Sequence, residues 1–284
     1  MIGQLISINA DQYEIKNNEK KYIVNAAGRL RLNETSPIVG DIVEFTPGEF
    51  LTKVLPRRNF LNRPKVANID QAIIVTSLVE PNYSSILLNK FLAIIEHNKI
   101  KPIILFTKKD LTVESHLKEY INQGYETYEI DNISKKGITE ISKIFKNKLS
   151  VFTGQTGAGK SSTINSIAGL NLQTDKISKS LGRGKHTTRV VKIFDWMDGQ
   201  LIDTPGFSSL DFNLTKLELS RSFHDFEKAS LKCKFSRSCI HYKEIHCEVK
   251  EMVIRNEITK QRYKDYVRLI EEVDNEKNSS FDFR

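Results

Sequence analysis

The most constraining feature of this chain is the stretch GQTGAGKSS at residues 154–162. It satisfies the pattern G-x-x-x-x-G-K-[ST], and it stands between the apolar segment SVFT and the helix-forming segment SSTINSIAGL, which is the context that the pattern requires. Glycines let backbone N–H groups curl around phosphates, the lysine adds a positive charge and the hydroxyl reaches Mg²⁺. The stretch predicts an α/β fold whose phosphate loop consists of Gly154, Gln155, Thr156, Gly157, Ala158, Gly159, Lys160, Ser161 and Ser162.

Two segments downstream of this loop have the residues of a nucleotide switch. QLIDTPG ends an apolar strand in D-T-P-G, where Asp203 is expected to hold Mg²⁺ through water and Gly206 to contact the γ-phosphate with its N–H. GRGKHTTR lies between the two motifs, and in it Thr187 or Thr188 is the candidate that closes over Mg²⁺ beside Ser161. This order predicts a GTPase, and which threonine closes stays open.

The segment TKKD, formed by Thr107, Lys108, Lys109 and Asp110, follows the apolar strand PIILF. It is similar to the guanine-reading motif N-K-x-D, in which the carboxylate accepts from guanine N1–H and the N2 amine, and a loop at a strand end is where a base is read. Lys108 and Asp110 match the motif, whereas Thr107 replaces Asn. Because of this difference, the contact made by the first residue of the motif is undetermined, and an ATPase remains the alternative.

Residues 1–62 are predicted to form a small β-barrel, because GQLISI, YEIK, KYIVNA, LRL and DIVEF are short apolar segments separated by turn formers. The pattern fits an OB-like or an SH3-like barrel. From about residue 67 strands and helices alternate, which predicts a doubly wound α/β domain. Beyond residue 212, LTKLELSRSFHDFEKASL and EMVIRNEITKQRYKDYVRLIEEV are predicted helices on either side of a Cys/His cluster.

That cluster uses every cysteine of the chain. Cys233, Cys239, His241 and Cys247 follow the spacing C-x5-C-x-H-x5-C, and three thiolates with one imidazole make a closed tetrahedral zinc site of the structural type. His246 is an alternative ligand, although it is adjacent to Cys247. We therefore expect one structural Zn²⁺, and three cysteines argue against a disulfide framework.

The charge of the chain favours a nucleic-acid partner. The net charge is +8 and the pI is near 9.2, and two stretches, residues 53–65 and 176–192, carry five and six basic residues without an acidic one. A merely soluble surface is the alternative. No apolar run approaches the roughly 18 residues that span a bilayer, and the start of the chain has no export leader. We expect a cytoplasmic monomer with no membrane partner.

The motif order, with the guanine motif ahead of the phosphate loop, is a circular permutation of the usual GTPase order. It resembles the circularly permuted GTPases, and among them the RsgA or YjeQ family of small-ribosomal-subunit-dependent GTPases. VGDIVEF, RPKVANIDQAIIV, NKFLAIIEHNKIKP, GRGKHTT, CKFSRSCIH and RYKDYVRLI add to the resemblance over nearly the whole chain. It implies an OB-like barrel at residues 1–62, a permuted GTPase domain at residues 63–212 and a helical zinc-binding domain at residues 213–284.

The resemblance also implies a function. Family members bind the small (30S) ribosomal subunit, hydrolyse GTP to GDP and phosphate faster on it, and act late in its maturation, so GTP, Mg²⁺ and ribosomal RNA are the expected partners. Phe207 stands where many GTPases have a water-orienting Gln, and the resemblance implies that His186 takes this role. Two alternatives remain: His186 faces RNA, or the chain is a nucleotide-gated RNA-binding module or translation factor with slow turnover.

The chain departs from the family pattern at the cluster. The loop CKFSRSC has one residue more than the family has between its first two cysteines, and Ile245 stands where the family has Pro. These differences affect the expected geometry of the loop more than the identity of the metal.

Overall fold

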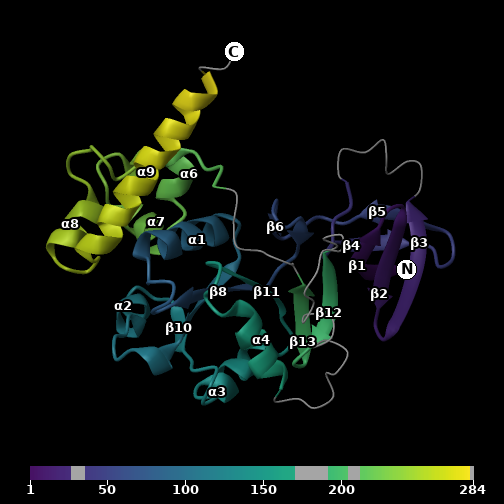
Figure 1. Cartoon of the computed structure of the whole chain (residues 1–284). Coiled ribbons are helices and arrows are strands. Elements are labelled where there is room, and N and C mark those ends of the chain that lie inside the picture. Colours follow the sequence, from purple (N-terminus) through teal and green to yellow (C-terminus); the bar gives the residue numbers. More distant parts are fainter. Residues whose placement is uncertain (27–35, 170–190, 204–211, 282–284) are drawn as a thin grey trace.

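The computed structural model describes residues 1–26, 36–169, 191–203 and 212–281, with side chains described up to residue 273 (Figure 1). An eleven-stranded sheet runs through the molecule in the order β10-β9-β8-β11-β13-β12-β1-β2-β3-β5-β4. Within the described residues, no helix is both long enough and apolar enough to cross a bilayer.

The amino-terminal strands close into a barrel. They are β1 (Ile2–Asn9), β2 (Gln12–Asn17), β3 (Lys20–Ala26), β4 (Ile42–Phe45) and β5 (Phe50–Val54). Strand β4 pairs with both β5 and β1, so the order β1-β2-β3-β5-β4 returns to its start, which is the OB-like arrangement. Alternate side chains fill the interior, among them Leu5, Ile15, Val43 and Phe45.

One strand of this barrel differs from the sequence prediction. The segment FLTKV forms β5, although its alternation is interrupted by two polar residues and only Leu51 is fully buried. The predicted strand LRL at residues 30–32 lies outside the described residues. Among the described residues, β5 is the fifth strand of the barrel and pairs with β3 and β4, and the pairing of β4 with β1 closes the barrel.

The sheet continues into an α/β unit with five parallel strands. They are β8 (Gln71–Ser77), β9 (Lys101–Thr107), β10 (Glu126–Glu129), β11 (Leu149–Gly154) and β13 (Gly199–Asp203). Strand β12 (Lys192–Trp196) is antiparallel to β13 and meets the barrel at the pair Ser7↔Lys192. Strand β11, which carries the phosphate-loop motif, lies between β8 and β13.

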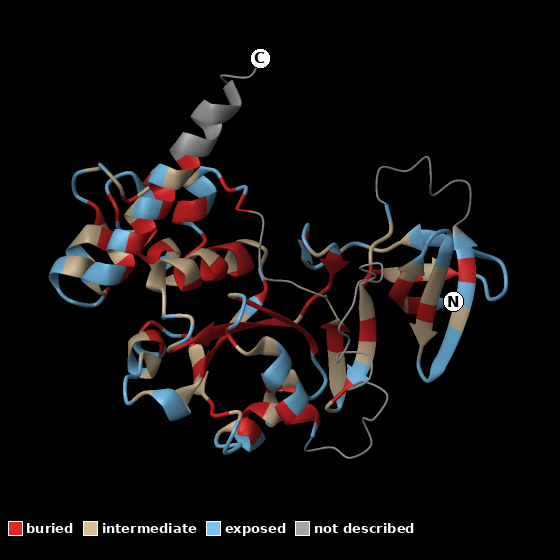
Figure 2. Ribbon diagram, in the orientation of Figure 1, coloured by how far each residue is buried: buried red, intermediate tan, exposed pale blue. Residues whose placement is uncertain are grey.

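Helices cover both faces of this parallel sheet (Figure 1). They are α1 (Ser85–His97), α2 (Leu117–Asn122), α3 (Ile138–Ser142) and α4 (Lys160–Ala168), with the 3₁₀ turns η2 (Lys109–Leu111) and η3 (Lys143–Phe145). Successive residues of β8 alternate between two cores: Ile74 packs with α1, whereas Ile73 packs with α3 and α4. Every residue of β8 is buried (Figure 2), as expected for a central parallel strand.

The carboxy-terminal unit is helical, as predicted. It contains α6 (Lys216–Ser220), α7 (His224–Ser230), η4 (Ser236–Ser238), α8 (Glu248–Ile254) and α9 (Lys260–Phe281). The predicted helix over the EMVIRNEITK segment is broken, because Asn256 takes a left-handed φ of 60° and separates α8 from α9. Ala93 and Ile94 of α1 share a core with these helices, so the unit packs directly on the α/β unit.

A small two-stranded sheet joins the barrel to the α/β unit. It pairs β6 (Phe60–Leu61) with β7 (Val66–Ala67). Leu61 and Val66 point into the same core as α1. The connecting segment is therefore held by packing and does not behave as a loose linker.

Candidate functional site

The phosphate-loop motif lies at the carboxyl edge of the sheet, where β11 ends and α4 begins. Its backbone uses left-handed conformations at Gly154, Gly157 and Gly159, with φ of 128°, 78° and 91°. A Cβ at Gly154 would lie 2.0 Å from the carbonyl oxygen of Val75, so only glycine fits there. The loop thus delivers the chain to the amino-terminal end of α4, which is an environment that favours anions.

The lysine of the motif folds back over this loop. Lys160 Nζ donates hydrogen bonds to the carbonyl oxygens of Gly154 (2.6 Å) and Gln155 (2.8 Å). Partial burial lowers the pKa of Lys160 below its usual value. Ser161 and Ser162 are exposed in the first turn of α4, with their hydroxyls accessible at the same edge.

The TKKD segment lies against the phosphate loop, and the contact is made by Thr107. This buried residue ends β9, and its hydroxyl donates to the carbonyl oxygen of Ala158 at 2.6 Å. The threonine that replaces Asn therefore still reaches across to the phosphate loop. Lys108 takes a left-handed φ of 60° and bonds the carbonyl of Glu80, while Asp110 is exposed in η2.

A third loop at this edge was not identified from the sequence. Asn132 follows β10, and its amide donates to Thr163 Oγ1 of α4 at 3.1 Å. Its buried Oδ1 has no hydrogen-bond partner among the described residues. The Nδ2 atom would lie 3.7 Å from a Cβ at Gly159, so this side chain supports the phosphate loop from the side. Its place just after a predicted strand is compatible with this edge, but its contact with α4 depends on the order of the strands in the sheet.

The aspartate of DTPG is at the same edge. Asp203 is the last residue of β13, the strand that pairs with β11. Burial raises the pKa of its carboxyl above the usual value, and a nearby cation would reverse that effect. His186, Thr187, Thr188 and Gly206 lie outside the described residues.

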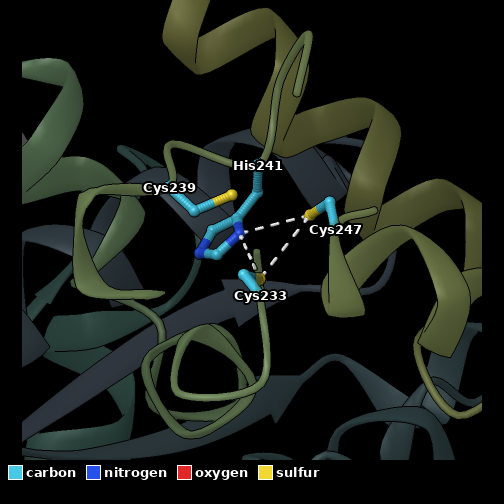
Figure 3. A group of neighbouring side chains, drawn as sticks. All are labelled: Cys233, Cys239, His241 and Cys247. Atoms are coloured by element: carbon cyan, nitrogen blue, oxygen red, sulfur yellow. Dashed lines mark hydrogen bonds between the residues drawn. The ribbon is translucent and has the colours of Figure 1, made fainter. Parts of the chain in front are cut away.

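The cysteines and histidine of the cluster come together between α7 and α8 (Figure 3). One donor atom from each of the four buried side chains lies within 4.8 Å of the others. His241 Nδ1 is 3.7 Å from the Cys233 sulfur and 3.4 Å from that of Cys247, and the two sulfurs are 4.0 Å apart. Among the described residues, His246 does not join this group.

These separations fit a zinc ion. With Zn–S bonds of about 2.3 Å and Zn–N bonds of about 2.0 Å, the edges of a tetrahedron are roughly 3.5–3.8 Å long. Burial lowers the pKa of His241 to about 4, so its Nδ1 is neutral and available as a ligand. Burial raises the pKa of Cys239 to about 12, and a bound cation would offset that cost of ionisation.

The loop that carries these donors is fixed by hydrogen bonds. Both oxygens of Glu244 accept from backbone N–H groups, those of Ile240 (2.7 Å) and Tyr242 (2.8 Å). Tyr263 of α9 donates to the carbonyl of His241 at 2.9 Å. His241 Nε2 is buried without a hydrogen-bond partner among the described residues. The other ring nitrogen, Nδ1, faces the sulfurs of the cysteines (Figure 3).

The fold and this edge of the sheet together define a class. The phosphate-loop motif follows β11, and the TKKD segment follows β9, which precedes β11 in the chain. This is a circularly permuted GTPase. The chain belongs to the RsgA GTPase family, whose model matches residues 54–213.

Individual relatives are similar over nearly the whole chain. The chain is 46% identical over 275 residues to the small ribosomal subunit biogenesis GTPase RsgA of Mycoplasmopsis pulmonis, covering 96% of this chain and 100% of the relative. It is 38% identical to the protein of that name from Streptococcus pneumoniae over 285 residues, with coverage of 98% and 97%.

Two solved structures have the same fold. YloQ, described as a circularly permuted GTPase, matches with a TM-score of 0.80 and 32% identity, covering 97% of this chain and 95% of that chain. YjeQ from Thermotoga maritima matches with a TM-score of 0.81 and 30% identity, covering 96% and 98%.

Proposed function

We propose that this GTPase acts in the biogenesis of the small ribosomal subunit, where it binds ribosomal RNA and hydrolyses GTP to GDP and phosphate while docked. The observation that supports the nucleotide chemistry is the hydrogen bond from Thr107 to the carbonyl of Ala158, because it holds the TKKD segment beside the phosphate-loop motif. The names of relatives with near-complete coverage support the ribosomal role.

The residues at the carboxyl edge of the sheet would have different roles in binding the nucleotide. Lys160 and the loop N–H groups would hold the phosphates, Ser161 and Asp203 would hold Mg²⁺, and Mg²⁺ would neutralise charge that develops on the phosphates. Lys108 would lie along the base while Asp110 accepts from guanine. Gly206 and either Thr187 or Thr188 would respond to the γ-phosphate.

The group that orients the attacking water is proposed to be His186. The residue after DTPG is Phe207, whose ring has no hydrogen-bonding atom, so it cannot position a water. His186→Ala is expected to abolish subunit-stimulated turnover while binding to the subunit is kept. Full turnover in that variant would assign the role to another group.

The proposed domains are a barrel at residues 1–62, a GTPase domain at residues 63–212 and a helical domain at residues 213–284. A structural Zn²⁺ on Cys233, Cys239, His241 and Cys247 would hold the last of these together. The proposal includes a monomer that works in the cytoplasm.

Base selectivity separates this proposal from an ATPase. In the first experiment, GTP and ATP compete for binding to the purified full-length protein, and we expect the protein to bind GTP more tightly. In the second, co-sedimentation with small ribosomal subunits is measured with a GTP analogue and with GDP, and we expect more protein to co-sediment with the analogue. Equal binding of ATP would contradict the guanine role of Asp110, and no co-sedimentation in either state would contradict the ribosomal role.

A further inference from the structure

A basic groove lies where three parts of the chain meet. Residues 53–63 form one wall, the carboxyl end of α1 forms another, and Asn213 and Leu214 close it. The hollow has a volume of about 740 Å³. Its lining contains the cationic side chains of Lys53, Arg57, Arg58, Arg63 and Lys99 as well as His97, and no carboxylate among the described residues.

One of these cations has a structural role. Arg57 donates to both oxygens of buried Asp41, at 2.7 and 2.9 Å, and to the carbonyl of Ser36 at 2.8 Å. Its charge is therefore compensated within the barrel. Arg57 fixes the wall of the groove and contributes little to its field.

Other cations keep most of their charge available at the surface. The side chain of Lys53 is 64% exposed and its nitrogen is 3.9 Å from Glu44. Arg58 is 62% exposed, and its Nη2 donates to Asp70 and to the carbonyl of Asn68, both at 2.9 Å. Lys99 is exposed just beyond α1. The exposed pair of Lys53 with Glu44 contributes little energy, so Lys53 can turn toward an anion at small cost. Arg58 stays held by Asp70 and Asn68 and can offer its other N–H groups.

The polar groups at the carboxyl end of α1 are engaged within the protein. Asn98 caps this end of the helix, because both its backbone N–H (3.2 Å) and its side-chain amide (2.8 Å) donate to the carbonyl of Ile94. The carboxylate of Glu96 is engaged by His224, at 2.8 and 3.0 Å, on the side of α7. The carbonyl of Ile94 and the carboxylate of Glu96 are thus already hydrogen-bonded at this wall of the groove.

An aromatic ring lies among these charges. Phe60 lines the groove and is 42% exposed, although it belongs to β6 and its backbone is fixed by pairing with Ala67. The guanidinium of Arg57 is 5.9 Å from the ring centroid. An exposed, fixed ring beside exposed cations is the combination that binds a nucleobase by stacking while its phosphates are neutralised.

We propose that this groove binds a single-stranded segment of RNA, with a base on Phe60 and phosphates on Lys53, Arg58 and Lys99. The inference rests on the proposed function, since the small ribosomal subunit supplies the RNA. An acidic protein segment would satisfy the cations but would leave the ring unused. RNA in the groove would contact the barrel, α1 and the start of the helical unit at once.

The first experiment asks what the groove touches. The full-length protein with Phe60→p-benzoylphenylalanine is bound to small ribosomal subunits with a GTP analogue, sedimented and irradiated. A crosslink to ribosomal RNA is expected. A crosslink to a ribosomal protein alone, or none from sedimented protein, would overturn the proposal.

The second experiment uses no ribosomal particle. Binding of a fluorescent ten-nucleotide uridine RNA is measured against salt for the wild type, for Phe60→Ala and for the double variant Lys53→Glu with Lys99→Glu. We expect Phe60→Ala to weaken binding about tenfold, and the double variant to lower the slope of log K against log salt by about 1.4. The matched control reverses two exposed lysines of η3 and its flank, Lys143→Glu with Lys146→Glu, and is expected to bind like the wild type.

The outcomes separate this proposal from the ribosomal role. If groove and control variants bind the RNA equally, the groove assignment is wrong, even when subunits stimulate turnover. If small subunits do not stimulate GTP turnover by the wild type, the proposed function is wrong. Binding of the uridine RNA still tests whether the groove binds RNA. Intrinsic GTP turnover is expected to be unchanged in all groove variants, which checks that they fold.

Discussion

At the scale of single residues, Thr107 explains how the unusual TKKD motif holds the site together. Its hydroxyl reaches the carbonyl of Ala158, so the residue that departs from the guanine motif supplies a link between the two loops. Thr107→Val keeps the shape but removes the donor and leaves a carbonyl unsatisfied. We expect a loss of about 1–3 kcal/mol in the free energy of unfolding and GTP binding weaker by about tenfold.

Denaturant unfolding and nucleotide titration check this prediction. Thr107→Ser keeps the hydroxyl and serves as the control, with near-normal affinity. Wild-type affinity in Thr107→Val would mean that the link between the loops is dispensable.

A second residue, His224, makes the junction of α7 and α1 sensitive to pH. Its Nδ1 is 2.8 Å from Glu96 Oε1 and its Nε2 is 2.7 Å from the carbonyl oxygen of Gln123. Both partners are acceptors, so the ring donates twice only as the imidazolium, and the bond to Glu96 raises the pKa of His224. Because the folded pKa is above the unfolded value of about 6.5, the stabilisation is complete below that pH and is lost as pH rises through the folded pKa.

An NMR titration of His224 tests this directly. We expect a pKa above 6.5 in the wild type, and a fall in Glu96→Gln, where the charge is gone and burial remains. Unfolding at several pH values should show the advantage of the wild type over Glu96→Gln shrinking as the pH rises. A wild-type pKa at or below the ordinary value would contradict the imidazolium assignment.

At the scale of elements, the proposed zinc ion is expected to stabilise the segment between α7 and α8. The segment contains little regular secondary structure, and its residues surround the side chains of Cys233, Cys239, His241 and Cys247. We expect one zinc per chain by elemental analysis. Removal of zinc by a chelator, or Cys239→Ser, should cost several kcal/mol of stability in the helical unit.

Added zinc is expected to restore the chelated wild type but not Cys239→Ser. Hydrogen exchange localises the effect, with faster exchange in α8 and little change in β8. A metal-free protein with full protection of α8 would show that packing alone holds this segment.

The sequence was sufficient for elements with a strong local pattern and insufficient where position depends on the rest of the fold. The phosphate loop, α1 and β9 were predictable because glycines, periodic apolar residues and a short apolar run identify them locally. Strand β5 was missed because its pairing with β4 and β3, not its own pattern, makes it a strand. The place of Asn132 beside α4 follows from the sheet order, which no local pattern encodes.

At the scale of the whole molecule, the two outer units are attached in different ways. The helical unit is joined by a buried network in which Arg262 donates to Asp225, Asn89 and Tyr125, each at 2.8–2.9 Å. The barrel meets the sheet through the pair Ser7↔Lys192 and through ion pairs such as that of Lys16 with Asp195 at 2.5 Å. Its buried residues Ile6 and Val39 also share an apolar core with α1 and β8. Exposed ion pairs are weak and are screened by salt, so the apolar packing of Ile6 and Val39 contributes most to the attachment of the barrel.

The central claim is that docking on the small ribosomal subunit accelerates GTP hydrolysis by this chain. The most direct measurement is GTP turnover by the full-length protein with and without purified small subunits, with Lys160→Ala as the inactive control. We predict a rise of about tenfold or more, equal to at least ~1.4 kcal/mol of transition-state stabilisation. Equal turnover with and without subunits would contradict the account and favour a nucleotide-gated RNA-binding module.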